Sequence, residues 1–472
     1  FVSVQPPAVP HWAMSRGYRG WVLAVLASVS TFGFIDRIVV QVLVQPIKAE
    51  LHVSDADLGL LGGLTFAVLY VALSIPVARV AERRSRIAIV TVGTALWSLA
   101  TAASGMAASF GQLLLARIGV GVGEATNGPA TVSIISDYFG PQRRASAMSI
   151  YGLAVPLGAF LGGSVGGLVA QTWGWRAAFL CAGLPGLLLA LLQGLTIREP
   201  PRGLHDPAPA GEPARTAAAD ATPSFGVPTT SFDVTPSFAA VLRRFWERRS
   251  LVQFIAGATL STVAGYGINY FLAAYFSRRF GLDYAQAGLV MGIVSSVPAA
   301  LSILAGGFLA DWAGKRSARW YALIPALGAA FTAPLYMASF AAGTWLAAAL
   351  LLALTAVCQY AYIPAAAAVT QNMMEPRMRA SAAAVTGLVF TLLGQGLGPL
   401  FAGMLSDHFS RSSYAGNFAL SCTGRSGVTS AACAAAASHG LEIALTLFAA
   451  IYLWSAVHLW LASRRLTADL AR

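Results

Sequence analysis

Long apolar runs recur along most of the chain, and each is about as long as a membrane-crossing helix. Because a helix rises 1.5 Å per residue, about 20 apolar residues cross a hydrocarbon core of about 30 Å. The pattern predicts an all-α membrane protein with twelve spans. These are Gly20–Val44, Leu58–Val80, Ile87–Ala107, Leu113–Phe139, Ala145–Thr172, Ala177–Ile197, Leu251–Ser277, Ala285–Ala310, Trp320–Phe340, Trp345–Thr370, Ala380–Ser406 and Leu441–Ala462.

A polar stretch at residues 198–249 separates six spans from six. Its first part is rich in Pro, Ala, Thr and Gly and has nothing to build a core, which is typical of a linker. Its last part, Ser237–Arg249, alternates aromatic and arginine positions as an amphipathic surface helix would. We therefore expect an N-terminal six-helix bundle (1–197), a cytoplasmic linker (198–249) and a C-terminal six-helix bundle (250–472).

Composition and charge placement support a membrane protein. Hydrophobic residues make up 57% of the chain and charged residues 11%, against about 25% charged in soluble domains. The net charge of +12 could suggest a nucleic-acid partner. Most Lys and Arg residues, however, fall on one side of the membrane if both termini are cytoplasmic, which is the positive-inside bias. We expect an N-in, C-in inner-membrane protein without a nucleic-acid partner, and see no cleavable signal peptide.

The two halves repeat one another. Several residues near the fourth and fifth spans recur 235 positions later in the chain. The matches are Pro129 and Pro364, Pro141 and Pro376, and Arg144 and Arg379. A fixed offset without a gap predicts a parallel repeat of six helices.

A basic loop pattern also occurs twice. The chain reads Gly307-Phe-Leu-Ala-Asp311-Trp-Ala-Gly314-Lys315-Arg316 in the second half and Ala78-Arg-Val-Ala-Glu82-Arg83-Arg84-Ser85-Arg86 in the first. An acid beside cationic helix ends can form a lock that holds one conformation; a solvated basic turn that only sets topology is the simpler alternative. We expect Asp137 to join the lock with Arg83. The candidate gating residues are Glu82, Arg83, Arg86, Asp137, Gly307, Asp311, Lys315 and Arg316.

These motifs resemble a known family. The second loop is similar to the major facilitator signature G-x-L-A-D-x-x-G-[RK]-[RK], whereas the first departs from it at Ala78, Glu82 and Ser85. Within that superfamily the chain resembles the spinster-like branch. The residues that carry this likeness are Phe34-Ile-Asp36-Arg37, Arg117-Ile-Gly-Val-Gly121-Val-Gly123-Glu124, Ser149-Ile-Tyr151-Gly152 and Arg198-Glu199-Pro200-Pro201. The resemblance implies a monomeric, proton-linked carrier of lysolipids or sphingosine phosphate, working by alternating access.

Four ionisable residues lie inside the first and fourth predicted spans: Asp36, Arg37, Arg117 and Glu124. Each would cost about 2.5–3.5 kcal/mol at the centre of a bilayer, so they must face a shared polar interior. Glu124 follows Arg117 by seven residues, which places it on the same face and about 10 Å deeper. Asp36 and Arg37 are adjacent and point about 100° apart, so we expect them to pair with Arg117 and Glu124 rather than with each other. The acids Asp36 and Glu124 are the expected proton-coupling residues.

The repeat confines this chemistry to one half, because Glu124 corresponds to Gln359, which does not titrate. The second half offers aromatic and amide groups instead. The candidate substrate-binding residues are Arg37, Arg117, Asn127, Tyr266, Asn269, Tyr270, Gln359, Tyr360, Tyr362 and Gln395. Protonating one acid would free an arginine for a phosphate or carboxylate headgroup, and the second half could hold a hydrocarbon tail. A permanent salt-bridge network is the structural alternative.

The alternative substrate class is a small organic anion, because organic-anion symporters of the same superfamily share the acid–arginine pair in the first helix. We find no nucleophile motif, phosphate-binding loop or metal-ligand spacing, so neither an enzyme nor a cofactor other than protons is expected. Cys422 and Cys433 lie in the polar loop before the last span, where a disulfide could close that loop in an oxidising compartment.

Overall fold

The computed structural model describes residues 15–201, 238–375, 378–422 and 430–470, and within these ranges the chain is helical with no strand. In the first half the helices are α2 (Arg16–Val42), α3 (Val44–Leu51), α4 (Asp55–Gly59), η1 (Leu60–Leu64), α5 (Thr65–Arg83), α6 (Arg86–Ser104), α7 (Phe110–Glu124), α8 (Asn127–Tyr138), α9 (Pro141–Gly152), α10 (Ala154–Trp173) and α11 (Trp175–Thr196).

In the second half they are α12 (Phe238–Glu247), α13 (Arg249–Phe280), α14 (Tyr284–Val294), α15 (Val297–Gly314), α16 (Trp320–Phe340), α17 (Trp345–Gln359), α18 (Tyr362–Met373), α19 (Arg379–Val389), η3 (Phe390–Leu397), α20 (Gly398–Ser412), α21 (Phe418–Cys422) and α22 (Ala431–Leu470). The segments η1 and η3 are π-helical turns, which occur often at functional sites.

Eleven helical stretches in the described residues are long and apolar enough to cross a membrane. The remaining predicted span, Leu113–Phe139, is divided into α7 and α8 by an interruption at Ala125 and Thr126. The structure therefore supports a multi-pass membrane protein, while the count of twelve spans stays a prediction.

The same interruption occurs at the equivalent position of the second half. In the second half α17 ends at Gln359 and α18 begins at Tyr362, and these positions lie 235 residues after Glu124 and Asn127. Glu124 and Gln359 thus close the first segment of a broken helix in each half. Broken helices inside a membrane protein place polar groups beside an internal cavity.

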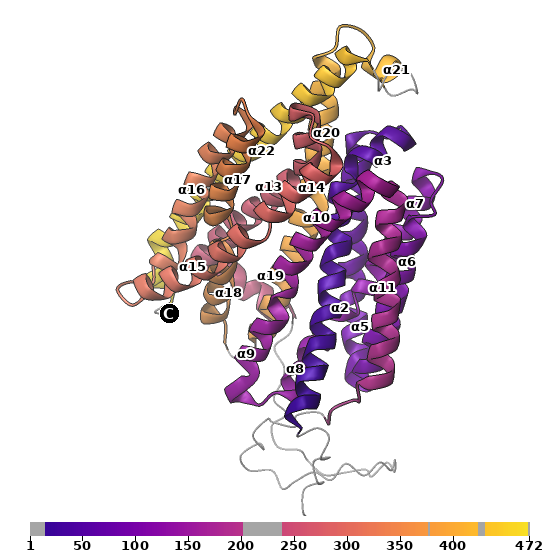
Figure 1. Cartoon of the computed structure of the whole chain (residues 1–472). Coiled ribbons are helices and arrows are strands. Elements are labelled where there is room, and N and C mark those ends of the chain that lie inside the picture. Colours follow the sequence, from indigo (N-terminus) through magenta and orange to yellow (C-terminus); the bar gives the residue numbers. More distant parts are fainter. Residues whose placement is uncertain (1–14, 202–237, 376–377, 423–429, 471–472) are drawn as a thin grey trace, which may run out of the picture.

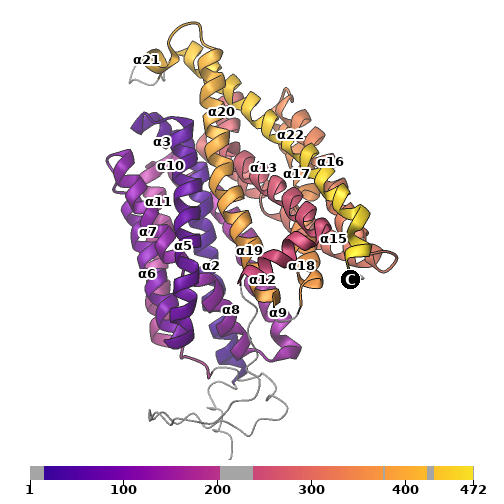
Figure 2. The same cartoon turned by 180° about the vertical axis from the view of Figure 1, so that it is seen from behind.

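The two halves stand side by side as separate bundles, with α2–α11 in one and α13–α22 in the other (Figure 1). We call the end that carries α3 and α21 the disulfide end, and the end where α11 finishes and α12 begins the linker end. Figure 2 shows from behind that the second bundle slants away from the first toward the linker end.

Glycines let the two bundles approach closely. A Cβ on Gly163 of α10 would lie 2.7 Å from the Gly288 carbonyl oxygen of α14, and one on Gly403 of α20 would lie 2.2 Å from the carbonyl oxygen of Asp55. Both neighbours are backbone atoms, so neither contact tolerates a side chain. Close contact between the bundles therefore explains some of the glycines in the fifth and eleventh predicted spans.

Candidate functional site

A cavity of about 250 Å³ lies between the two bundles. The structure brings nine of the ten candidate substrate-binding residues to its wall. They are Arg37, Arg117, Tyr266, Asn269, Tyr270, Gln359, Tyr360, Tyr362 and Gln395. Asn127 is not on this wall, and its Oδ1 accepts a hydrogen bond from the Thr131 hydroxyl at 2.6 Å.

Asp36 and Arg117 form a fully buried pair between α2 and α7. The Arg117 guanidinium donates from Nη1 to Oδ1 at 2.8 Å and from Nη2 to Oδ2 at 2.7 Å. The Thr101 hydroxyl donates a further hydrogen bond to Oδ1 at 2.8 Å. Asp36 is therefore held by two helices other than its own, and both of its oxygens have donors. Such bidentate pairs are strong and geometrically specific.

Arg37 pairs with Glu124, so the two charges on α2 turn to different partners. Its Nε donates to Oε2 of Glu124 at 2.8 Å, and Nη2 donates to the same oxygen. The guanidinium also lies 4.8 Å from the Phe66 ring centroid and 5.3 Å from that of Phe34. Side chains on a helix lean toward its N-terminus, which directs Arg37 toward Glu124. The Arg37 side chain remains 28% exposed, against 5% for Glu124.

The carboxylates of Asp36 and Glu124 differ in the hydrogen bonds that their oxygens accept. The buried Oε1 of Glu124 has no hydrogen-bond partner in the described part of the chain, whereas Asp36 has three donors. A buried carboxylate oxygen without a donor costs free energy while the group is ionised. Glu124 can therefore bind a proton at Oε1 without displacing an existing hydrogen bond.

The second half contributes uncharged polar groups to the cavity. The Tyr336 hydroxyl donates to Oε1 of Gln359 at 2.6 Å, and Asn269 Nδ2 donates to the Gly265 carbonyl at 2.8 Å. Tyr270 crosses to the first half, where its hydroxyl donates to the Leu58 carbonyl at 2.7 Å. This wall can contact an amphipathic molecule through aromatic faces and hydrogen bonds, but it adds no charge of its own.

A second charged cluster joins the two halves at the disulfide end. Asp55 accepts two hydrogen bonds from Arg278 at 2.7 Å each, one from Lys48 at 2.6 Å and one from the Ser406 hydroxyl at 2.6 Å. Asp407 accepts from the Asp55 amide at 3.0 Å. We call this group the Asp55 lock, because its members come from both halves.

Sequence reasoning missed the lock. Ser54 begins α4 with a capping box that includes Asp57, and this turn presents Asp55 to the second half. The available signal was an acid at the start of one predicted span and another, Asp407, just after the end of a span in the other half.

At the linker end, Arg86 is the central cation. It donates to Asp137, to Glu199 at 2.7 Å from Nε and to the Pro200 carbonyl at 3.0 Å. The expected pairing of Asp137 with Arg83 is therefore wrong in this conformation, since Arg83 is exposed and Arg86 turns inward. These contacts of Arg86 all lie within the first half, and they fix the exit of α11.

Glu199 is the partner of Arg86 that sequence reasoning did not assign. Burial alone would raise the pKa of Glu199, but hydrogen bonds from the Ile87 amide, Arg86 and Ser85 outweigh this and lower it. Its carboxylate bridges the start of α6 to the residues after α11. The sequence signal was the Arg-Glu-Pro-Pro stretch that leaves the sixth span.

The second loop copy is arranged differently. Asp311 accepts a hydrogen bond from the Tyr321 hydroxyl at 2.8 Å, while Lys315 and Arg316 are exposed. Gly307 packs near Pro364. Tyr321 lies 235 residues after Arg86, so a neutral side chain replaces the central cation of the first half. The Glu82 side chain lies outside the described part of the structure.

Cys422 and Cys433 form a disulfide, with 5.5 Å between their Cα atoms. It ties α21 to the start of α22 and packs with Phe418 and Ala436 in a small apolar cluster. The cluster lies at the disulfide end, near the Asp55 lock.

Comparisons with known proteins agree with this architecture. Residues 25–399 match the family model described as Major Facilitator Superfamily. An MFS-type efflux pump of Mycolicibacterium smegmatis is 31% identical over 82% of this chain and 85% of its own length. Protein spinster homolog 1 of Xenopus tropicalis is 27% identical over 83% of this chain and 73% of its own length. A probable L-galactonate transporter of Escherichia coli is 25% identical over 66% of this chain and 67% of its own length.

Among solved structures, a bacterial homolog of the human lysosomal transporter spinster superposes with a TM-score of 0.83 and 30% identity. The match covers 96% of this chain and 99% of that one. That crystal structure is described as inward-facing and unoccupied.

Proposed function

The chain belongs to the Major Facilitator Superfamily, and on that basis we propose that it is a proton-coupled secondary transporter of an amphipathic anionic lipid. The substrate class we propose is a lysophospholipid or a sphingosine-phosphate-like molecule. Family and fold make the chain a multi-pass membrane transporter. Three points belong to the proposal: the substrate class, the coupling ion, and which end of the molecule faces which side of the membrane.

The observation that carries the proposal is the Glu124 oxygen without a hydrogen-bond donor, beside the partly exposed Arg37. When Glu124 is ionised, it neutralises Arg37. A proton on Oε1 removes that charge, so the guanidinium becomes free to bind a phosphate or carboxylate headgroup in the cavity. Asp36 keeps Arg117 neutralised throughout, because both of its oxygens are already held. One proton thus controls one positive charge in the binding site.

The wall opposite Arg37 supports an amphiphile over a small acid. A small polyhydroxy acid needs polar or basic groups from both sides of its site, whereas the second half supplies Tyr, Asn and Gln side chains together with apolar ones such as Ala299 and Ile303. An apolar tail can lie against these residues while the headgroup binds Arg37. The likeness to spinster proteins supports the same substrate class.

Alternating access would move this site between the two sides of the membrane. The Asp55 lock closes the cavity at the disulfide end, which supports a conformation open toward the linker end. We place the linker end and both termini in the cytoplasm of an inner-membrane protein. The conformation is then inward-facing, as in the bacterial spinster homolog. The unit of transport is a monomer in contact with membrane lipids.

The second candidate function is symport of a small organic anion with protons. It is favoured by the relative named as a probable L-galactonate transporter. Arg37 and Arg117 could both bind such an acid, and the second half would then supply hydrogen bonds only.

The test is uptake into proteoliposomes of labelled lysophosphatidylglycerol and of labelled galactonate, with and without an imposed pH gradient. Wild type and Glu124→Gln are compared. We expect gradient-driven lipid uptake that the variant loses. Glu50→Gln is the matched control, because Glu50 pairs with the exposed Arg176 outside the cavity and should leave uptake unchanged.

Two results would contradict the proposal. If only galactonate accumulates, the organic-anion function is correct. If the lipid moves but neither the gradient nor Glu124→Gln matters, the charged cluster is structural and protons are not coupled through it.

A further inference from the structure

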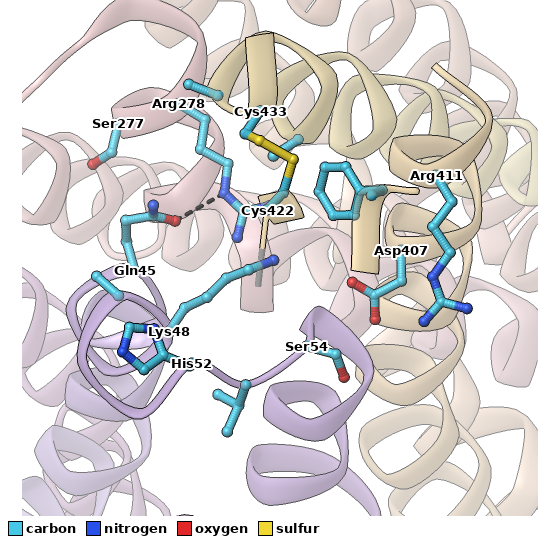
Figure 3. Close-up of a pocket in the computed structure, with 15 residues that line it drawn as sticks. Gln45, Lys48, His52, Ser54, Ser277, Arg278, Asp407, Arg411, Cys422 and Cys433 are labelled. Carbon is cyan, nitrogen blue, oxygen red and sulfur yellow. Dashed lines mark hydrogen bonds between the residues drawn. A yellow bond between two sulfur atoms is a disulfide. The ribbon is translucent and has the colours of Figure 1, made fainter. Parts of the chain in front are cut away.

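A second cavity of about 250 Å³ opens at the disulfide end, and it shares no lining residue with the central one. Figure 3 shows Lys48 and His52 on one side of it and Asp407 and Arg411 on the other, with the disulfide near Arg278. The walls come from both halves of the chain. The first half contributes Gln45, Lys48, Ala49, His52, Val53 and Ser54, and the second contributes the rest.

The cavity carries an excess of positive charge. Lys48, Arg278 and Arg411 line it, against a single lining carboxylate, Asp407. Both Asp407 oxygens accept backbone amides of α4, which hold the carboxylate in place without removing its charge. Asp55 lies behind the wall and neutralises one more charge. The exposed Arg411 guanidinium has no ion pair within the described ranges.

Lys48 is the cation that gains most from an additional anion. Its ammonium makes one hydrogen bond, to Asp55, and its side chain is only 19% exposed. Burial lowers the pKa of Lys48, because an ammonium loses its hydration there. Asp55 opposes this effect, and Arg278 adds to it. Two of the three ammonium donors remain available toward the cavity.

The opposite wall is apolar and fixed in place. Phe418, the disulfide, Ala434 and Ala437 form it, and the disulfide holds α21 against the first turn of α22. An occupant therefore meets the Lys48 ammonium on one side and an aromatic ring with sulfur atoms on another. His52, beside Lys48, has a left-handed backbone with φ of 54°, which is uncommon for a residue other than glycine and is enriched at functional sites.

We propose that this cavity is a regulatory binding site for a small anion with an apolar body, such as an aromatic carboxylate or sulfonate. The anionic group contacts Lys48 and is attracted by Arg411 from across the cavity, and the apolar body packs on Phe418 and the disulfide. Because the walls come from both halves, the site exists only while the disulfide end is closed. A ligand that binds one conformation shifts the population toward it. Occupancy therefore holds the transporter closed at this end and inhibits turnover.

The first experiment is calorimetric titration of the purified full chain in detergent with benzenesulfonate, and with sulfate as the ion that lacks an apolar body. We expect benzenesulfonate to bind more tightly than sulfate. Arg411→Gln should weaken it about fivefold, as expected for the loss of about 1 kcal/mol from one partly exposed charge. Arg465→Gln, an exposed arginine near the end of α22, is the matched control and should change nothing.

A second measurement keeps the proposal testable if one variant folds poorly. Dithiothreitol, or the double variant Cys422→Ser/Cys433→Ser, should weaken benzenesulfonate binding, because α21 is then no longer linked to α22 by the disulfide. Unchanged affinity in Arg411→Gln and after reduction would overturn the site. Equal affinity for sulfate would overturn the apolar requirement. Loss of binding in Arg37→Gln alone would place the ligand in the central cavity instead.

Discussion

Glu124 and Gln359 occupy the same position in the two halves, each as the last residue of a helix that is interrupted at the same point of the repeat. Glu124 faces Arg37, whereas Gln359 accepts a hydrogen bond from Tyr336. The fold is thus repeated and the charge is not. A cation on the facing helix, rather than the position itself, distinguishes the proposed proton site from the neutral wall.

This asymmetry leads to a prediction about moving the carboxylate. The double variant Glu124→Gln/Gln359→Glu should not recover the gradient-driven uptake that we expect Glu124→Gln to lose, because in the described residues Gln359 pairs with Tyr336 and not with an arginine. A buried carboxylate without a cation also costs folding free energy, so the double variant should unfold at a lower temperature than Glu124→Gln. Proteoliposome uptake and tryptophan-detected melting in detergent measure the two effects. Recovery of uptake would show that the second half can couple protons, and would contradict the proposed division of labour.

A second prediction concerns the buried pair of Asp36 and Arg117. Asp36→Asn leaves the Arg117 guanidinium buried without its counter-charge, which should destabilise the protein by about 3–5 kcal/mol. The double variant Asp36→Asn/Arg117→Met removes both charges and should be more stable than Asp36→Asn alone. Unfolding midpoints of the two singles and the double form a cycle that isolates the pair.

Two results would contradict the role given to this pair. If Asp36→Asn melts like wild type, the pair is not a structural requirement. If the double variant is no more stable than Asp36→Asn, the loss has a cause other than the unpaired charge.

A third prediction tests the Asp55 lock. Asp55→Asn should weaken the contacts with Lys48 and Arg278 and let the disulfide end open more often. A cysteine at Gln395, in the central cavity, reports this opening when Cys181 and Cys358 have been replaced by alanine. An impermeant maleimide added from the disulfide side should label it about tenfold faster, corresponding to about 1.4 kcal/mol in the closing equilibrium.

Gly403→Ala provides a control that changes no charge. Its Cβ would meet the Asp55 carbonyl oxygen, so closure should be hindered by steric contact and labelling should also accelerate. Slower labelling in either variant would show that the disulfide end is not the closed one in this conformation.

The sequence contained enough to predict how the central charges pair. Asp36, Arg37, Arg117 and Glu124 lie in apolar helices, where a charge without a partner is costly, so the candidate partners were few. The repeat likewise predicted that Gln359 is the counterpart of Glu124. Both inferences needed only helix geometry and the free energy of burying a charge.

The Asp55 lock could not be predicted in the same way. Asp55 begins α4, Arg278 lies in the last turn of α13 and Asp407 lies inside α20. These helices are far apart in the chain, and no regular spacing connects the three residues. Their meeting depends on how the two halves lie in one conformation. The prediction that Arg83 pairs with Asp137 was wrong for a related reason. The residue at which α6 begins decides whether Arg83 or Arg86 points inward.

The last prediction concerns acid stability at the linker end. Because folding lowers the pKa of Glu199, the carboxylate stabilises the fold at pH values above its unfolded pKa, about 4.3. That contribution is lost as the pH falls through the lower folded value. Glu199→Gln should therefore reduce the free energy of unfolding at pH 7 by about 1 kcal/mol, a modest value because the side chain is 31% exposed.

The difference between wild type and Glu199→Gln should shrink as the pH falls below about 4 and vanish when Glu199 is protonated in both states. Melting in detergent, followed by tryptophan fluorescence from pH 7 to pH 3, measures it. Glu375→Gln is the matched control, since Glu375 is exposed and has no ion pair in the described residues, and it should melt like wild type at every pH. A difference for Glu199→Gln that grows in acid would mean that folding raises the pKa of this carboxyl, and that Arg86 is held mainly by Asp137.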